Sequence, residues 1–309
     1  ITERKLNVNS NIQFGEGGAG TFSDGKLTNR KKDPIGKWLF KEFVKAGAPE
    51  EILYVNNPHI GTDRLINVVK NIRKEIESLG STIHFESKVS NISPHKEGIL
   101  LTVNDEKLIY DEVILAIGHS SRDTIEMLYK NQCDIEQKPF AVGFRIEHRQ
   151  SEINKTQYGE NFNNPKLDAA EYKLTHQTKD GKGIYTFCMC PGGWVVPAST
   201  ENDEVVVNGM SLSRRDSPFA NSGMVSTVEP EDLRYLQKEH GILAGIVFQK
   251  QLERTAKQAG GGGQVAPAQR VADYVSGKIS ADLPETSYFP GLNSAPLHEL
   301  LPSWITSRM

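Results

Sequence analysis

Apolar residues recur at helical spacing in two stretches near the start of the chain. The first predicts a helix that ends at Gly47, with an apolar face made of Trp38, Leu39, Phe40, Phe43 and Val44. The second predicts a helix that Thr62 or Asp63 caps and Gly80 ends, with an apolar face made of Leu65, Val68, Val69, Ile72 and Ile76.

The pattern then changes to short apolar runs that are typical of strands. Strands are expected at residues 82–85, 88–92, 98–103 and 107–110. Residues 112–118 form a continuous apolar run that ends in glycine, the pattern of a strand buried on both faces of an α/β sheet. A further helix is expected to open at His119. The first part of the chain is therefore predicted to be an α/β domain.

From Lys138 onward the sequence becomes more irregular and more polar. Strands are expected there at residues 140–147, 183–189, 194–197 and 204–210. We place a domain boundary near residue 138, with a mixed α+β domain over residues 139–290 and a final segment over residues 291–309.

The composition mainly excludes certain classes of protein. The 309 residues suffice for two domains, and the hydrophobic and charged fractions, 37% and 24%, are ordinary for a soluble globular protein. The net charge of −3 gives no electrostatic footprint for nucleic acid or an anionic membrane. No apolar run approaches the roughly 20 residues that cross a bilayer. We expect no nucleic-acid or membrane partner.

Three cysteines, Cys133, Cys188 and Cys190, are too few for a disulfide framework and fit a reducing cytoplasm. They also cannot supply a four-cysteine zinc site, and no HExxH pattern occurs. The sequence predicts a cytoplasmic protein without a metal.

Residues 15–20 read GEGGAG. Glycine allows positive φ and close approach of the backbone to a ligand, and successive free amides can form an anion-binding nest. The motif lacks the ending of an ATP-binding P-loop, so a plain flexible loop is an equally good interpretation.

Residues 115–123 place glycine between the apolar run and a helix start. Ligands of α/β sheets bind beyond the carboxyl ends of strands, where helix amides face phosphate or flavin oxygens. The alternative is an ordinary strand–turn–helix connection.

Cys188 and Cys190 are two residues apart on a predicted strand, so both thiols are expected on one face. They form either a redox dithiol or, as the favoured alternative, two buried small side chains.

Arg145, Glu147 and His148 follow one another on another predicted strand, with Arg145 and Glu147 on one face and His148 opposite. Arginine can hold an anionic group and histidine can act as acid or base. Structural pairing is the more frequent role of such residues.

Together with their neighbours, these motifs resemble a family of bacterial FAD-dependent dehydrogenases related to the NAD(FAD)-utilising flavoproteins. The resembling stretches span nearly the whole chain in order: residues 14–28, 58–65, 115–124, 138–148, 185–193, 208–222 and 266–271. The resemblance implies a partial glutathione-reductase-like FAD-binding domain over residues 1–138, interrupted by a substrate-type domain, to which residues 291–309 return. It also implies a fragment that lacks the family's opening GxGxxG unit and its closing FAD segment.

The resemblance further implies FAD as cofactor, with NAD(P)H as electron donor, a small-molecule substrate and hydride transfer. Cofactor-binding residues are expected at Gly17, Gly18, Thr21, Ser23, Lys26, Val89, Gly118 and Ser120. Candidate catalytic residues are Arg145, His148, Cys188 and Cys190. The glycine-rich turn and the turn at residues 118–121 are expected to meet around the dinucleotide. Two alternatives stay open: a flavin-stabilised protein that binds a macromolecule, and an inactive truncated fragment.

Overall fold

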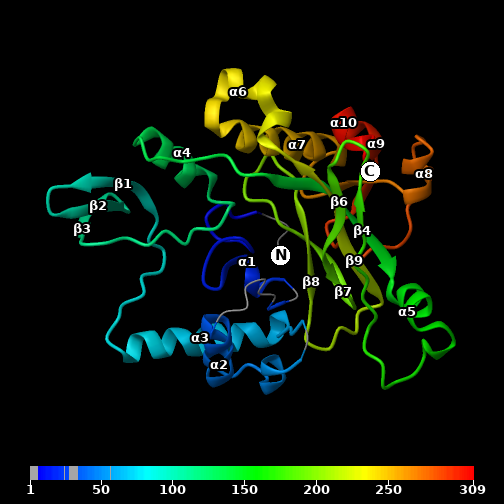
Figure 1. Ribbon diagram of the computed structural model, residues 1–309, viewed down its shortest axis with the longest axis horizontal. Coiled ribbons are helices and arrows are strands. Elements are labelled where there is room, and N and C mark those ends of the chain that lie inside the picture. The colour runs from blue at the N-terminus through cyan, green and yellow to red at the C-terminus, as the bar shows by residue number, and fades with distance from the viewer. Residues whose placement is uncertain (1–5, 24, 28–33, 56) are drawn as a thin grey trace. The chain divides into compact units, whose positions relative to one another are not determined.

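The structure is a computed structural model that describes residues 6–23, 25–27, 34–55 and 57–309 (Figure 1). Asp24 and Thr28 of the glycine-rich stretch lie outside these residues. The chain forms two compact units. Unit 1 comprises residues 1–75, 140–228 and 250–309, and unit 2 comprises residues 76–139 and 229–249. It is a mixed α/β structure with several antiparallel sheets.

The first part of unit 1 is helical. It contains α1 (Gly18–Thr21), α2 (Pro34–Lys45), η1 (Glu50–Leu53) and most of α3 (Thr62–Ser78). The two predicted helices are confirmed. Gly47 and Gly80 follow them with φ of 103° and 87°, values that glycine tolerates and that end a helix. Partly buried Phe40, Phe43 and Leu65 pack against the small core of Ala46, Ala48, Ile52, Ile60 and Val68.

An antiparallel sheet forms the centre of unit 1. Its strand order is β4-β9-β6-β5, and β4, β9 and β6 lie side by side in Figure 1. The bounds are β4 (Phe140–Arg149), β5 (Thr175–Gln177), β6 (Gly183–Cys190) and β9 (Phe219–Val228). A second pair joins β7 (Gly193–Pro197) to β8 (Val207–Ser211), and β10 (Ala266–Ala268) runs parallel to β11 (Leu292–Ser294). The strand predicted at residues 204–210 begins only at Val207, because Glu204 and Val205 precede the residues of β8 that pair with β7.

Helices accompany these strands in unit 1. They are α5 (Gln150–Tyr158), η2 (Gly159–Asn161), the larger part of α7 (Ala244–Gly260), α8 (Val271–Val275), α9 (Leu297–Leu300) and α10 (Ser303–Thr306). Val195, Val205, Ala266 and Tyr288 form a second core cluster, so residues from three separate parts of the chain share one interior.

Unit 2 contains the antiparallel meander β1 (Val89–His95), β2 (Gly98–Val103) and β3 (Glu106–Tyr110). Its helices are α4 (Arg122–Lys130), η3 (Pro230–Leu233), α6 (Arg234–His240) and η4 (Gly241–Leu243). The helix α4 is held to β1 because the Asn131 amide donates to Asn91 Oδ1 and to the carbonyl of Ile92, both at 2.7 Å.

Two strand predictions in unit 2 are wrong. Residues 82–85 and 112–118 are irregular, and no strand in the described part of the chain pairs with them. The apolar run is exposed: Ile114 retains 93% of its accessible surface. The meander forms because its strands are sequence neighbours that satisfy each other's backbone groups, whereas a buried strand needs partners from elsewhere. Among the described residues, no helix has the length and apolar character needed to cross a bilayer.

Candidate functional site

The glycine-rich turn packs against α3. Gly17 and Gly18 have φ of 80° and 51°, and a side chain on Gly17 would overlap the hydroxyl of Thr21. Glu16 Oε1 lies 3.2 Å from Arg73 Nε on α3, which ties the tip of the turn to that helix. Thr21 is 5% exposed, and its Oγ1 has no hydrogen-bond partner in the described part of the chain. The turn therefore presents a buried hydroxyl next to a backbone conformation that favours glycine.

Ser23 and Lys26 continue this turn toward the sheet. Ser23 Oγ accepts from the amide of Gly25 at 3.2 Å, and the Thr62 hydroxyl donates to the Ser23 carbonyl. Lys26 Nζ donates to the carbonyl oxygen of Met189, between the two candidate cysteines. The structure thus brings the predicted residues Lys26, Cys188 and Cys190 together across more than half of the chain.

A β-bulge interrupts β6 at these cysteines. Phe187 pairs with Gly223 and Cys190 with Asn221, so Cys188 and Met189 together oppose the single residue Ser222. Cys188 has a left-handed φ of 48°, which is uncommon for a residue other than glycine. The expected placement of both thiols on one face is not supported, because it assumed regular alternation, which the bulge breaks.

Arg145 on β4 is the centre of a polar cluster beside the bulge. Its Nη1 donates to Asn221 Oδ1 at 2.6 Å and to the Cys188 carbonyl at 3.3 Å, and its Nη2 donates to Asn208 Oδ1 at 3.3 Å. A side chain on Gly209 would overlap Arg145 and Asn221 and lie 2.8 Å from Cys190 Sγ. Asn208 and Asn221 were not singled out from the sequence, although both lie in one of the stretches that carry the family resemblance.

The turn after Cys190 is fixed from several sides. The Gly192 amide donates to Gln150 Oε1 at 2.7 Å, and Ser211 Oγ donates to the Pro191 carbonyl at 3.0 Å. On the neighbouring segment, the amide and hydroxyl of Ser213 donate to the Asp63 carboxylate at 2.8 and 2.7 Å. Burial raises the pKa of Asp63, but these hydrogen bonds outweigh it, and the net pKa lies below the ordinary value.

Comparison with known proteins identifies the family of this chain. A family model described as "FAD-dependent protein, C-terminal domain-like" matches residues 139–309, more than half of the chain. The chain belongs to this family. A Clostridium beijerinckii protein that carries only the name "Uncharacterized protein" is 48% identical over 310 residues, which cover 99% of this chain and 57% of the relative. The chain therefore spans little more than half the length of this curated relative.

Membership in an FAD-dependent family agrees with the predicted association with FAD. The matched region contains Arg145, Asn208, Asn221 and both cysteines of the bulge. Lys26 and the glycine-rich turn precede the matched region in the chain. They nevertheless belong to unit 1, as Arg145 and both cysteines do.

His148 lies on the opposite face of β4 from Arg145, as predicted from alternation. Its Nε2 lies 3.1 Å from the hydroxyl of Tyr172, and the two rings meet edge to face. Burial lowers the pKa of His148, although Glu152 and Glu147 partly oppose this, and burial raises the pKa of Tyr172. Both groups are therefore neutral near pH 7. Tyr172 has no sequence signal, since it lies in an irregular segment 24 residues from its partner.

We expect His148 to make stability depend on pH. Because the folded state disfavours the imidazolium, the unfolded chain takes up the extra proton first, and the free energy of unfolding falls as pH drops below about 6.5. His148→Gln should lose less stability than wild type between about pH 8 and about pH 5 in urea unfolding. NMR titration of the His148 ring should give a midpoint below about 6.5, and a midpoint at or above this value would contradict the expectation.

The remaining predicted cofactor residues belong to unit 2. Val89 begins β1 and pairs with Val103, and the Ser120 carbonyl accepts from the Arg122 amide at 2.9 Å. Gly118 has φ of 70° and open space where a side chain would lie. The two glycine turns lie in different units, so their convergence around a dinucleotide stays a prediction.

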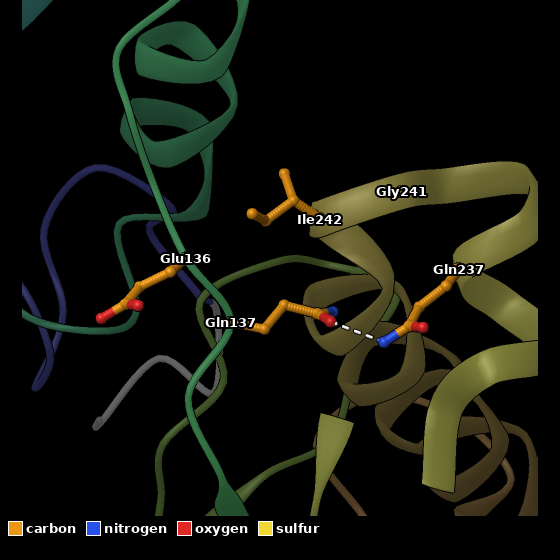
Figure 2. Close-up of a pocket in the computed structure, with 5 residues that line it drawn as sticks. All are labelled: Glu136, Gln137, Gln237, Gly241 and Ile242. Carbon is orange, nitrogen blue, oxygen red and sulfur yellow. Dashed lines mark hydrogen bonds between the residues drawn. The ribbon is translucent and has the colours of Figure 1, made fainter. Parts of the chain in front are cut away.

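A pocket of about 390 Å³ in unit 2 is lined by Glu136, Gln137, Gln237, Gly241 and Ile242 (Figure 2). Gln237 Nε2 donates to Gln137 Oε1 at 2.8 Å, and Glu136 pairs with Lys138. The pocket contains none of the predicted site residues, and the one ionisable side chain of its lining, Glu136, is already paired with Lys138.

Glu201, Asp203 and Glu204 bring carboxylate oxygens within 4.8 Å of one another. Lys250 Nζ lies 3.1 Å from Glu201, and Arg254 Nε lies 2.6 Å from Asp203. Basic side chains therefore already balance part of this negative charge, and the three carboxylates belong to a cluster of ion pairs.

Proposed function

We propose that the protein is an FAD-dependent oxidoreductase that transfers hydride between FAD and a small-molecule substrate or NAD(P)H. Bound FAD would supply the redox chemistry, and the chain would supply position and charge. The proposal covers the whole cytoplasmic protein, in which residues 1–138 bind the cofactor and residues 139–290 face the substrate. Membership in the FAD-dependent family supports it most directly.

The glycine-rich turn fits a dinucleotide in one specific respect. A buried hydroxyl without a partner costs about 1 to 3 kcal/mol, so Thr21 Oγ1 is destabilising unless a ligand accepts from it or donates to it. The Gly17 amide would point at the pyrophosphate, and Gly18, whose amide donates to the Gly15 carbonyl at 3.0 Å, would shape the turn. Ser23 and Lys26 would border the pyrophosphate. Val89, Gly118 and Ser120 would complete the cofactor site.

The catalytic residues would act around the sheet of unit 1. Arg145 would hold negative charge next to the bulge, and His148 with Tyr172 would exchange a proton with the substrate. The neutral state of His148 near pH 7 leaves its imidazole able to accept that proton.

Replacing Thr21 by valine tests the proposal in the full-length protein. The isosteric change removes the orphaned hydroxyl, so without FAD the variant should melt at or above the wild-type temperature. Its affinity for FAD, measured by flavin fluorescence, should nevertheless fall about tenfold, which corresponds to about 1.4 kcal/mol.

Ser226→Ala is the matched control, because Ser226 Oγ is a second buried hydroxyl without a partner among the described residues. It should raise stability in the same way and leave FAD affinity unchanged. Wild-type protein should purify yellow and bleach under a reductant. A colourless protein whose melting temperature does not respond to added FAD would overturn the proposal and favour the inactive fragment.

A further inference from the structure

The bulge in β6 makes the two thiols unequal. Cys188 is partly accessible, whereas Cys190 is fully buried. The Cys190 thiol folds back and donates to the Cys188 carbonyl oxygen at 3.4 Å. The Cys188 thiol can therefore meet a substrate from solvent, whereas the Cys190 thiol is closed to solvent.

A disulfide between the two residues depends on how the bulge bends the strand. In a regular strand, Cα atoms two residues apart lie about 6.6 Å from each other, near the upper limit for a disulfide. A left-handed residue bends the strand at the bulge and shortens this span. A side chain on Gly209 would lie 2.8 Å from the Cys190 sulfur, so the packing around this thiol requires glycine there.

Two cationic side chains converge on the same backbone. Arg145 donates to the Cys188 carbonyl and Lys26 to the Met189 carbonyl. Positive charge beside a thiol favours the thiolate, which is the nucleophilic form. Left-handed residues that the surroundings hold in place are concentrated at functional sites.

We propose that Cys188 and Cys190 are a redox dithiol whose substrate class is low-molecular-weight disulfides. The Cys188 thiolate attacks a substrate sulfur, forms a mixed disulfide and releases the first substrate thiol. Cys190 then loses its proton and attacks the Cys188 sulfur, which releases the second substrate thiol. The substrate disulfide gains two electrons and two protons, and the protein retains a Cys188–Cys190 disulfide. Passage of the electron pair between this disulfide and FAD rests on the proposed function, but formation of the disulfide does not.

The test uses the Cys133→Ser variant, because this change removes the third cysteine of the chain, an exposed thiol in unit 2. Incubation with oxidised glutathione should yield monomeric protein that has lost two hydrogen atoms, and peptide mapping should join Cys188 to Cys190. Adding Cys190→Ala should trap glutathione on Cys188, since the resolving thiol is gone. Adding Cys188→Ala should leave Cys190 unmodified, because it is buried.

Cys133 of the wild-type chain is the internal reference for an ordinary exposed thiol. Cys188 should react with iodoacetamide faster than Cys133 despite its lower exposure, and Lys26→Met should reduce this advantage. The proposal is overturned if the Cys133→Ser protein stays reduced or gives only mixed or intermolecular disulfides. That measurement needs no FAD, so it fails or succeeds independently of the Thr21→Val experiment.

Discussion

We expect Gly192→Ala to reduce the free energy of unfolding by about 2 to 5 kcal/mol, the largest effect of any single methyl added near the site. Gly192 has φ of 50°, and an added Cβ would overlap the backbone carbonyl of Arg215. A backbone atom cannot rotate away as a flexible side chain can, so the two segments that meet here must separate. Urea unfolding followed by circular dichroism measures the loss.

The consequence should extend to the cysteines, because the Gly192 amide also anchors the turn to Gln150. Gly263→Ala is the matched control: its φ is 57°, but nothing lies within 4 Å of the added Cβ. It should cost only the left-handed backbone penalty of about 1 to 2 kcal/mol. Equal losses in the two variants would show that the contact with Arg215 is not tight.

Arg145→Met should cost about 2 to 4 kcal/mol and disorder the bulge. The change leaves the buried Asn221 without its 2.6 Å donor, and the Asn221 Nδ2 already has no partner among the described residues. It also removes the donor to the Cys188 carbonyl. Denaturant unfolding measures the stability, and amide hydrogen exchange at residues 187–190 should accelerate.

Arg149→Met, on the same strand, is the control that separates the loss of the Arg145 cluster from the loss of a positive charge alone. Arg149 is 43% exposed at its side chain and pairs with the exposed Glu285 on the surface. Surface ion pairs contribute about 1 kcal/mol or less, so this variant should be nearly as stable as wild type and keep its bulge protected. A similar loss for both variants would contradict the central role of Arg145.

The helices show where sequence reasoning works. The apolar faces and closing glycines of α2 and α3 predicted their course because helical hydrogen bonds are local. The apolar run at residues 112–118 shows the opposite. Its composition predicted burial, but a strand exists only if other strands pair with it, and Ile114 stays exposed.

The central strand β9 was missed for a different physical reason. Its buried positions include Asn221, Ser222 and Ser226, so no alternation of apolar and polar residues marks it. Two of these polar side chains find partners on the adjacent strands: Asn221 Oδ1 accepts from Arg145 on β4, and Ser222 Oγ donates to the Phe187 carbonyl on β6. Tyr172 was missed as well, since only its contact with His148 gives it a role.

By itself, the sequence determined the mixed α/β class, the two helices next to the glycine-rich turn and the membership in an FAD-dependent family. The tertiary structure alone decided that Lys26 and Arg145 meet at one bulge and that Cys188 and Cys190 differ in exposure. Helices and turns follow from interactions among neighbours in the chain. The bulge follows from the register in which β6 pairs with β9, and the paired residues lie more than thirty positions apart in the chain.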